Sequence, residues 1–150
     1  MRAVIQRVSG ASVTVNGGAP RTIGAGVVVL LGVRDTDTLA ICPKLAQKCA
    51  GLRIFDDAEG KLNLSAEDLG LSALVVSNFT LYGDTKKGKR PSFIAAAKPP
   101  LAIDAYEAFV AELRKTRLAH VETGEFGAEM QLTLTNDGPI TIVIDTDEWK

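Results

Sequence analysis

The sequence contains few of the residues that bind metals or act as covalent nucleophiles in enzymes. It has two cysteines and one histidine among 150 residues. With so few ligands, no zinc site of ordinary spacing can be assembled. A Ser-His-Asp triad would have to include His120, and no G-x-S-x-G motif supplies its serine. If the chain is an enzyme, we therefore expect its chemistry not to use the usual protein nucleophiles.

The two cysteines are too far apart for a disulfide bond. Cys42 and Cys49 lie seven residues apart in a segment with helical periodicity. Two helical turns separate their Cα atoms by roughly 10 Å, which exceeds the span of a disulfide. Both lie on the apolar face of the predicted helix, so we interpret them as small core residues.

No segment is apolar enough to cross a membrane or to act as a secretion signal. The longest apolar run, Val27 to Val33, is far shorter than the ~20 residues that a membrane-spanning helix needs. The first ten residues, MRAVIQRVSG, carry charges and lack an apolar core followed by a cleavage site. We therefore expect a cytoplasmic protein without a membrane partner.

The composition is typical of one folded domain. Hydrophobic residues make up 46% of the chain, charged residues make up 23%, and the net charge is −1. A high apolar content with a low net charge excludes disorder of the whole chain. A chain of about this length can bury roughly 70% of the surface that it exposes when unfolded. We therefore predict a single domain over residues 1–150.

The apolar pattern changes between strand and helix periodicity, which predicts an α+β fold. Alternation from Ala3 to Val15, followed by Asn16-Gly17-Gly18, predicts a strand and a hairpin turn. Helical spacing predicts one helix from near Pro43 to Gly51 and another over 105–118. The other predicted strands cover residues 21–23, 27–33, 52–57, 62–65, 74–82, 130–135 and 140–144. With mostly antiparallel connections, this is a strand-rich domain with two main helices.

The strand predicted over 74–82 becomes polar at its end, in the segment SNFTLY. Period two would place Asn78, Thr80 and Tyr82 on one face of that strand. A half-exposed strand would explain this pattern, because threonine is common in strands. Alternatively, the segment forms the floor of a small site, whose hydroxyl and backbone N–H groups stabilise an oxyanion.

A cluster of cations follows this segment. The sequence KKGKR places four of them within five positions: Lys86, Lys87, Lys89 and Arg90. Such a run is often a solvated loop. It can also bind phosphate groups, including those of a polynucleotide, because the local charge and not the net charge determines binding.

Two further features are weaker signals. The segment Asn136–Thr141 (NDGPIT) is typical of a turn between two strands, although a Gly-Pro bond can also be cis at low cost. A cis bond would point the flanking carbonyl groups in one direction. Phe126 lies between two glycines, so its ring either fills a gap in the core or covers a pocket.

Together these blocks resemble the D-aminoacyl-tRNA deacylase family. The resemblance is carried, in this order, by MRAVIQRVSGASVTV, SNFTLYGDTKKGKRPSF, ETGEFGAEM and NDGPIT. It extends from Met1 to Ile144, and the last six residues lie outside it. The resemblance implies a barrel-like fold, a homodimer and hydrolysis of the ester that joins a D-amino acid to the 3′-terminal adenosine of tRNA. It also implies activity on glycyl-tRNA mischarged on tRNA(Ala), and no metal or organic cofactor.

The resemblance also implies roles for particular residues. The catalytic strand motif corresponds to Ser77, Asn78, Phe79 and Thr80. Substrate binding and rejection of L-amino acids are implied for Gly138, Pro139, Phe126 and Met130, with a cis Gly138–Pro139 bond that reaches into the partner's pocket. We expect the tRNA backbone to be bound by Lys86, Lys87, Lys89 and Arg90. The resemblance implies that the substrate's own ribose 2′-OH helps to activate the water, so Thr80 need not act as a nucleophile.

This chain has Asn78 where the family usually has glutamine. If that amide only supports the adjacent loop, activity should survive. If it contacts the adenosine or the ester, affinity should fall by the ~1 kcal/mol typical of one hydrogen bond. Two alternatives therefore stay open, a non-catalytic tRNA-binding module of the same fold and a dimeric scaffold with a solvated basic loop.

Overall fold

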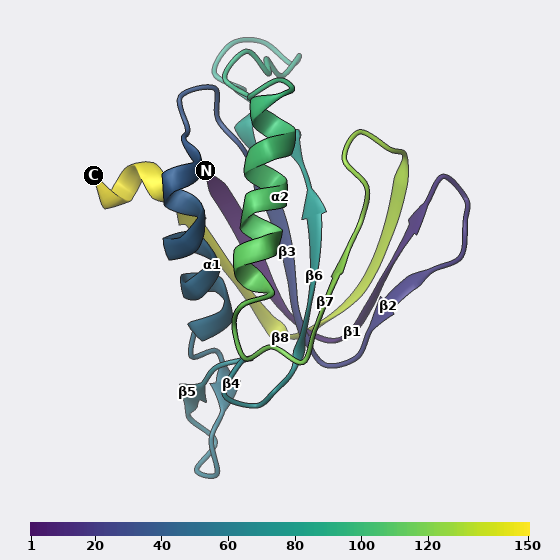
Figure 1. The fold of residues 1–150 in the computed structure, drawn as a ribbon, viewed down its shortest axis with the longest axis vertical. Coiled ribbons are helices and arrows are strands. Elements are labelled where there is room, and N and C mark those ends of the chain that lie inside the picture. The colour runs from purple at the N-terminus through teal and green to yellow at the C-terminus, as the bar shows by residue number, and fades with distance from the viewer.

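Two helices cover one face of a mixed six-stranded sheet in the computed structural model, which describes residues 1–150 (Figure 1). The strands are β1 (Arg2–Val15), β2 (Arg21–Ile23), β3 (Gly26–Gly32), β4 (Phe55–Asp56), β5 (Leu62–Leu64), β6 (Ser72–Ser77), β7 (His120–Thr123) and β8 (Met130–Asp145). The helices are α1 (Cys42–Gly51) and α2 (Leu101–Leu113), with short 3-10 helices at Leu39–Ile41, Phe79–Tyr82 and Thr146–Trp149. The predicted strand-rich α+β class is therefore confirmed. No helix is both long and apolar enough to span a membrane.

The long strand β1 organises the sheet. It pairs antiparallel with β3 through residues 2–8, with β2 through residues 11–13, and with β8 along almost its whole length. The sheet curls far enough for Arg21 on β2 to reach β7, where its Nη1 donates to the Thr123 carbonyl oxygen at 2.9 Å. This bond links strands at opposite ends of the sheet order, so the sheet is nearly closed and barrel-like, as expected.

Strands β3, β6 and β7 are parallel to one another. Parallel neighbours need a crossover connection, and here α1 and α2 lie in the two crossovers. Both helices therefore lie on the same face, in front of the central strands in Figure 1. Parallel strands also end at the same edge of the sheet. The carboxyl ends of β3 and β6 meet there, at the pair Leu31–Ser77.

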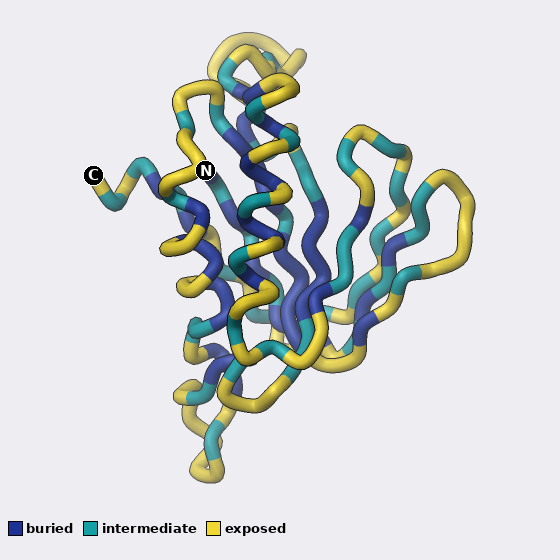
Figure 2. The backbone as a smooth tube through the Cα atoms, in the orientation of Figure 1, coloured by how far each residue is buried: buried dark blue, intermediate teal, exposed yellow.

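The core lies between the helices and the sheet, and Figure 2 shows the buried backbone gathered there. The predicted helix stripes are confirmed as buried: Cys42, Leu45, Ala46 and Cys49 on α1, and Tyr106, Phe109, Val110 and Leu113 on α2. Burial raises the pKa of the Cys42 thiol to about 11 and that of Cys49 to about 12. Both thiols therefore stay protonated and unreactive at neutral pH.

The strand predicted over 74–82 ends earlier, at Ser77. Beyond this residue β6 has no partner strand, because β3 itself ends at Gly32. The chain instead turns over Gly32 as a 3-10 helix, and a Cβ at Gly32 would lie 3.3 Å from the Tyr82 ring. Tyr82 is consequently buried whereas Thr80 is exposed. The prediction that Asn78, Thr80 and Tyr82 share one strand face is wrong.

The turn predicted at Asn136–Thr141 is a bulge within the single strand β8. Val8 pairs with Asn136 and Gln6 pairs with Thr141, so the same β1 strand continues as the partner on both sides. The intervening residues 137–140 are extruded from the ladder. The prediction of two separate strands joined by a hairpin loop is therefore wrong, because both halves pair with β1 and not with each other.

Both boundaries of α2 also differ from the expectation, and the strand predicted over 52–57 is reduced to β4 at Phe55–Asp56. Helix α2 begins at Leu101, four residues before the predicted start, because Pro100 is accepted at the N-cap. It ends at Leu113, where the Thr116 hydroxyl donates to the Leu113 carbonyl oxygen at 2.6 Å. Strand β7 was not predicted, since a segment of four residues carries too short an alternation to be recognised.

Candidate active site

A cavity of about 530 Å³ opens at the carboxyl end of β6. Three segments that are distant in the sequence form its wall, namely the end of β6, the segment before α2 and the loop before β8. The residues that line it are Ser77, Asn78, Phe79, Phe93, Ala96, Ala97, Lys98, Pro99, Phe126, Gly127, Ala128 and Met130. The structure therefore brings together Ser77, Asn78 and Phe79 with Phe126 and Met130, but Thr80 is not part of this wall.

The end of β6 places polar groups at the floor of this cavity. The Asn78 backbone N–H donates to the Leu31 carbonyl oxygen at 2.8 Å, which fixes the chain where the strand stops. Phe79 and Thr80 then occupy the first two positions of the 3-10 helix. Backbone N–H groups at these positions have no acceptor within their own helix. They are therefore available to an oxygen that develops negative charge.

The side-chain amide of Asn78 forms a hydrogen bond with a residue close to it in the sequence. Its Oδ1 accepts a hydrogen bond from the Thr80 hydroxyl. The Thr80 hydroxyl therefore faces an amide and not a base that could remove its proton. This contact matches a role for the Asn78 amide in supporting the adjacent turn, and Asn78 also lines the cavity.

The loop that carries Phe126 is held at both ends. At its start, a Cβ on Gly124 would overlap the Met130 sulfur, so glycine allows Met130 to fold across the loop. At its end, Asn16 N donates to the Glu129 carbonyl oxygen at 2.8 Å, and Asn16 Oδ1 accepts from Glu129 N at 3.2 Å. Phe126 and Met130 thus form a fixed side of the cavity.

The opposite side of the cavity contains residues that the sequence did not indicate. Phe93 packs edge-on against Phe79, with ring centroids 5.2 Å apart. Lys98 is the one charged residue among those lining the cavity. A single lysine in the alanine-rich segment AAAKPP gives no recognisable motif, so only the fold shows that it lines the same cavity as Asn78 and Phe126.

The bulge with Gly138 and Pro139 lies outside this cavity. Its Gly138–Pro139 peptide bond is cis, as the resemblance implied. Asn136 closes the bulge, since its Oδ1 accepts from Ile140 N at 2.8 Å and its Nδ2 donates to the Ile140 carbonyl oxygen at 3.2 Å. Both Gly138 and Pro139 are exposed. Within one chain, the structure does not bring them together with Ser77 and Phe126.

Arg7, on the partner strand β1, anchors this bulge. Its side chain is almost fully buried, and its Nε donates to the Asp137 carbonyl oxygen at 2.8 Å. Its Nη1 donates to the Ile54 carbonyl oxygen at 2.9 Å, which ties the bulge to the chain before β4. The sequence carried a signal for Arg7, because a charged residue follows Ala3 and Ile5 in the inward-facing series of β1.

The predicted basic loop projects beside the cavity. Its base is closed by two backbone bonds, Asp84 N to Ser92 O at 2.7 Å and Ser92 N to Asp84 O at 2.9 Å. Its cations, Lys86, Lys87, Lys89 and Arg90, are all exposed and form no salt bridge. They do not line the cavity, but Phe93 follows the loop directly and does.

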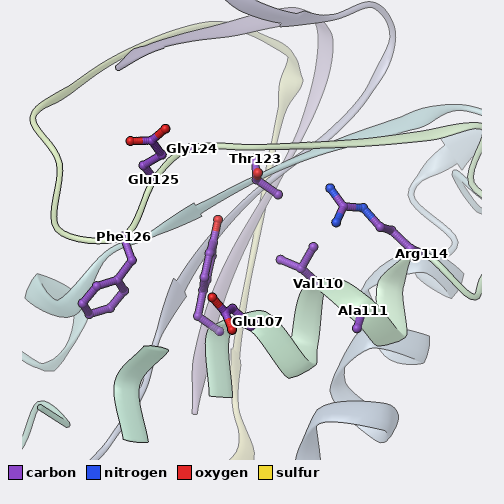
Figure 3. A pocket seen from close by; sticks show the side chains of 9 residues that line it. Glu107, Val110, Ala111, Arg114, Thr123, Gly124, Glu125 and Phe126 are labelled. Carbon is purple, nitrogen blue, oxygen red and sulfur yellow. The ribbon is translucent and has the colours of Figure 1, made fainter. Parts of the chain in front are cut away.

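A second cavity, of about 410 Å³, lies between α2 and the loop after β7 (Figure 3). Phe126 lines both cavities, so its loop separates them. Glu107, Arg114 and Glu125 contribute charged groups to this second cavity. The Tyr106 hydroxyl donates to the Val75 carbonyl oxygen at 3.1 Å, and burial raises the pKa of Tyr106 to about 12. Tyr106 therefore acts here as a structural hydrogen-bond donor.

Comparisons with known proteins identify similar proteins over almost the whole chain. The family model described as D-Tyr-tRNA(Tyr) deacylase matches residues 4–145. A D-aminoacyl-tRNA deacylase of Thermus aquaticus is 56% identical over 148 residues, which cover 99% of this chain and 97% of that protein. A D-aminoacyl-tRNA deacylase of Chloroflexus aurantiacus is 58% identical over 150 residues, which cover 100% of this chain and 93% of that protein.

Solved structures show the same fold. A c-Myc DNA unwinding element binding protein superposes with a TM-score of 0.90 at 41% identity, covering 97% of this chain and 98% of that one. A probable eukaryotic D-amino acid tRNA deacylase superposes with a TM-score of 0.86 at 17% identity, covering 95% of this chain and 97% of that one. The second likeness concerns the fold alone. Because the family model matches residues 4–145 and these two relatives are 56% and 58% identical, this chain belongs to the D-Tyr-tRNA(Tyr) deacylase family.

Proposed function

We propose that this chain hydrolyses the ester between a D-amino acid and the 3′-terminal adenosine of tRNA. The observation that carries the proposal is the cavity at the end of β6, which unites Ser77, Asn78 and Phe79 with Phe126 and Met130. These residues come from two sequence blocks that are characteristic of the family. Its apolar walls suit a nucleoside ring, and its polar floor suits the ester.

The chemistry follows from the groups at that floor. Water attacks the ester carbonyl carbon, and the bond from this carbon to the ribose 3′ oxygen breaks. The leaving 3′ oxygen takes a proton from the attacking water. The backbone N–H group of Phe79, which lines the cavity, stabilises the negative charge that develops on the carbonyl oxygen. The substrate's own 2′-OH orients the water, so the protein contributes positioning and charge stabilisation rather than a nucleophile.

The proposed selectivity requires a second copy of the chain. Gly138 and Pro139 are exposed on a bulge outside their own chain's cavity, so they would reach the cavity of a partner in a homodimer. Their main-chain carbonyl groups cannot rotate away, and they would collide with an L side chain at the α-carbon. Glycine has no side chain to reject. We therefore include glycyl-tRNA, mischarged on tRNA(Ala), among the substrates.

An apolar row on the uncovered face of the sheet supports such a dimer. Val143, Val4 and Leu30 are cross-strand neighbours on β8, β1 and β3. The exposed fraction of Val143 is 66%, and its strand β8 pairs only with β1. A symmetric contact between two such faces would bury this row and bring the two bulges toward opposite cavities.

The basic loop is the proposed contact for the tRNA backbone. Lys86, Lys87, Lys89 and Arg90 lie beside the cavity and are free of carboxylate partners, so their charge is available to phosphates. The competing function is a tRNA-binding module without activity, for which Asn78 in place of the family's usual glutamine is the supporting observation.

Single-turnover deacylation of matched D- and L-tyrosyl-tRNA tests the proposal. We expect rapid loss of the D ester while the L ester survives. Hydrolysis of neither ester, with tRNA binding intact, would establish the non-catalytic module, and Asn78→Gln would then be the next variant. Sedimentation of the same samples tests the dimer, and a monomer with full D/L selectivity would contradict the role given to the bulge of the partner.

A further inference from the structure

An exposed apolar surface borders the cavity at the end of β6. It consists of Phe79, Phe93 and Ile94, whose exposed fractions are 54%, 38% and 86%. Phe79 and Phe93 also line the cavity, so this surface begins at its rim. Ile94 is the most exposed of the large apolar side chains. Contiguous exposed apolar groups beside a site indicate a surface that a ligand covers.

The surface is held in place by the backbone around it. A Cβ at Gly83 would lie 3.1 Å from Phe93 Cε1, so glycine lets the Phe93 ring pack directly against this turn. Ser92 N donates to Asp84 O at 2.9 Å, and Ala97 N donates to Val33 O at 2.9 Å. These bonds hold the segment on both sides of Phe93 and Ile94. The two side chains are therefore presented at fixed positions before any ligand binds.

Unpaired positive charge lies on both sides of this surface in the sequence. The four cations of the basic loop precede it, and Lys98 follows it on the cavity wall. Lys98 is exposed and forms no salt bridge. No carboxylate lines this cavity. The arrangement is an apolar platform between cations, which suits a single-stranded polynucleotide that stacks its bases and presents its phosphates.

We infer that Lys98, Phe93 and Ile94 bind the nucleotide that precedes the terminal adenosine of the substrate. The inference rests on the proposed function, which places that adenosine in the cavity. The ammonium group of Lys98 binds the phosphate that joins the two nucleotides. The base of the preceding nucleotide covers Phe93 and Ile94, and the strand then continues toward the basic loop.

A second copy of the chain is the other candidate to cover this surface. A symmetric contact between two copies would bring the cations that flank the surface toward each other, and like charges at an interface are unfavourable. An RNA strand brings the opposite charge. The charge around the surface therefore favours RNA.

The test compares two small substrates on the whole protein, the D-tyrosyl ester of adenosine and the D-tyrosyl ester of the dinucleotide cytidylyl-adenosine. The quantity measured is the ratio of kcat/KM for the dinucleotide ester to kcat/KM for the adenosine ester. We expect a ratio of about ten, in the range that one stacked base supplies. Ile94→Ser and Lys98→Ala should each lower this ratio several-fold, and Lys98→Arg should restore most of it. Because Phe93→Ala could disturb the turn at Gly83, the exposed residues Ile94 and Lys98 carry the test.

Lys48→Ala, which removes an exposed lysine from α1, is the matched control and should keep the parent ratio. A parent ratio near one, or an unchanged ratio in both variants, would overturn the inference and leave the proposed function intact if the adenosine ester is hydrolysed. A change of oligomeric state in Ile94→Ser would assign the surface to a second copy instead. Failure to hydrolyse either ester or D-tyrosyl-tRNA would reject the proposed function, and this inference with it.

Discussion

At the scale of single residues, Gly138 has little freedom to change. Its φ is +143°, and an added Cβ would lie 2.8 Å from Ile140 N and 2.9 Å from Ile140 Cγ1. Both the torsion and the contacts require glycine, because L residues avoid such a φ at a cost of about 1–3 kcal/mol.

We therefore expect Gly138→Ala to shift the bulge and to raise the rate of L-tyrosyl-tRNA hydrolysis relative to the D ester. Single-turnover rates on both esters measure this change. Gly24→Ala is the control, since a Cβ there meets nothing within 4 Å. Unchanged D/L selectivity in Gly138→Ala would argue against the bulge as the selective wall.

Arg7 supports the same bulge through two backbone carbonyl groups. Arg7→Met keeps much of the side-chain volume but leaves the oxygens of Asp137 and Ile54 without their charged donor. We expect the free energy of unfolding to fall by about 2–3 kcal/mol, as measured by urea denaturation. Arg117→Met, at an exposed position, should change it by less than about 1 kcal/mol. Equal losses in the two variants would contradict the anchoring role of Arg7.

Thr80 tests whether a hydroxyl takes part in the chemistry. Its side chain is exposed, lies outside the cavity wall and donates to the Asn78 amide. Thr80→Ala removes one hydrogen bond, so we expect the single-turnover rate on D-tyrosyl-tRNA to fall by about tenfold or less. Complete loss of activity with tRNA binding intact would restore a mechanism that depends on this hydroxyl.

At the scale of elements, the basic loop should act through charge alone. Replacing Lys86, Lys87 and Lys89 with alanine removes three unpaired cations from a loop whose base is closed by backbone bonds. We expect weaker tRNA binding and a smaller slope of log Kd against log salt, by about 0.7–0.9 for each phosphate that the loop no longer neutralises. Filter binding over a range of salt concentrations measures the slope. A slope equal to that of the parent would show that the loop is merely solvated.

The elements that the sequence predicted well are those whose pattern is local. Alternation predicted β1, the Asn-Gly-Gly turn predicted its hairpin to β2, and helical spacing predicted α1 with its buried face. The end of β6 could not be predicted in this way. Apolar and polar residues continue to alternate past Ser77, but the strand stops because its neighbour β3 has ended. A strand boundary thus depends on a partner that is distant in the sequence.

At the scale of the whole molecule, hydrogen bonds and ion pairs hold the last residues of the chain against β1 and the segment after β3. The N-terminal ammonium donates to Thr146 Oγ1 at 2.5 Å, and Arg34 Nη1 lies 2.5 Å from Asp147 Oδ2. Hydrogen bonds from Lys150 and Arg34 lower the pKa of Asp147 below its ordinary value. Burial raises the pKa of Asp145, but the hydrogen bond from Arg2 and the other favourable contacts outweigh this effect and lower it overall.

A lowered carboxyl pKa in the folded state stabilises the protein above the unfolded value of about 3.9, and this contribution is lost as the pH falls through the folded value. We therefore expect the urea midpoint to fall between pH 5 and pH 2, and to fall less in Asp147→Asn. Asp104→Asn, which removes a carboxylate without an ion pair, should follow the parent. Identical pH profiles for Asp147→Asn and the parent would exclude a contribution from this carboxylate.

The sequence by itself determined the fold class and two of the three segments that form the cavity wall, the end of β6 and the loop before β8. Hydrophobic periodicity depends on neighbours along the chain, so it indicates which faces are buried, and the motif blocks indicate the family. Which residues meet was decided only by the tertiary structure. The parallel pairing of β3 with β6 places Ser77 at one edge, and the loop after β7 brings Phe126 to the same place. Lys98 acquires its place on the cavity wall because it lies in the crossover that contains α2, and no local pattern encodes such a crossover.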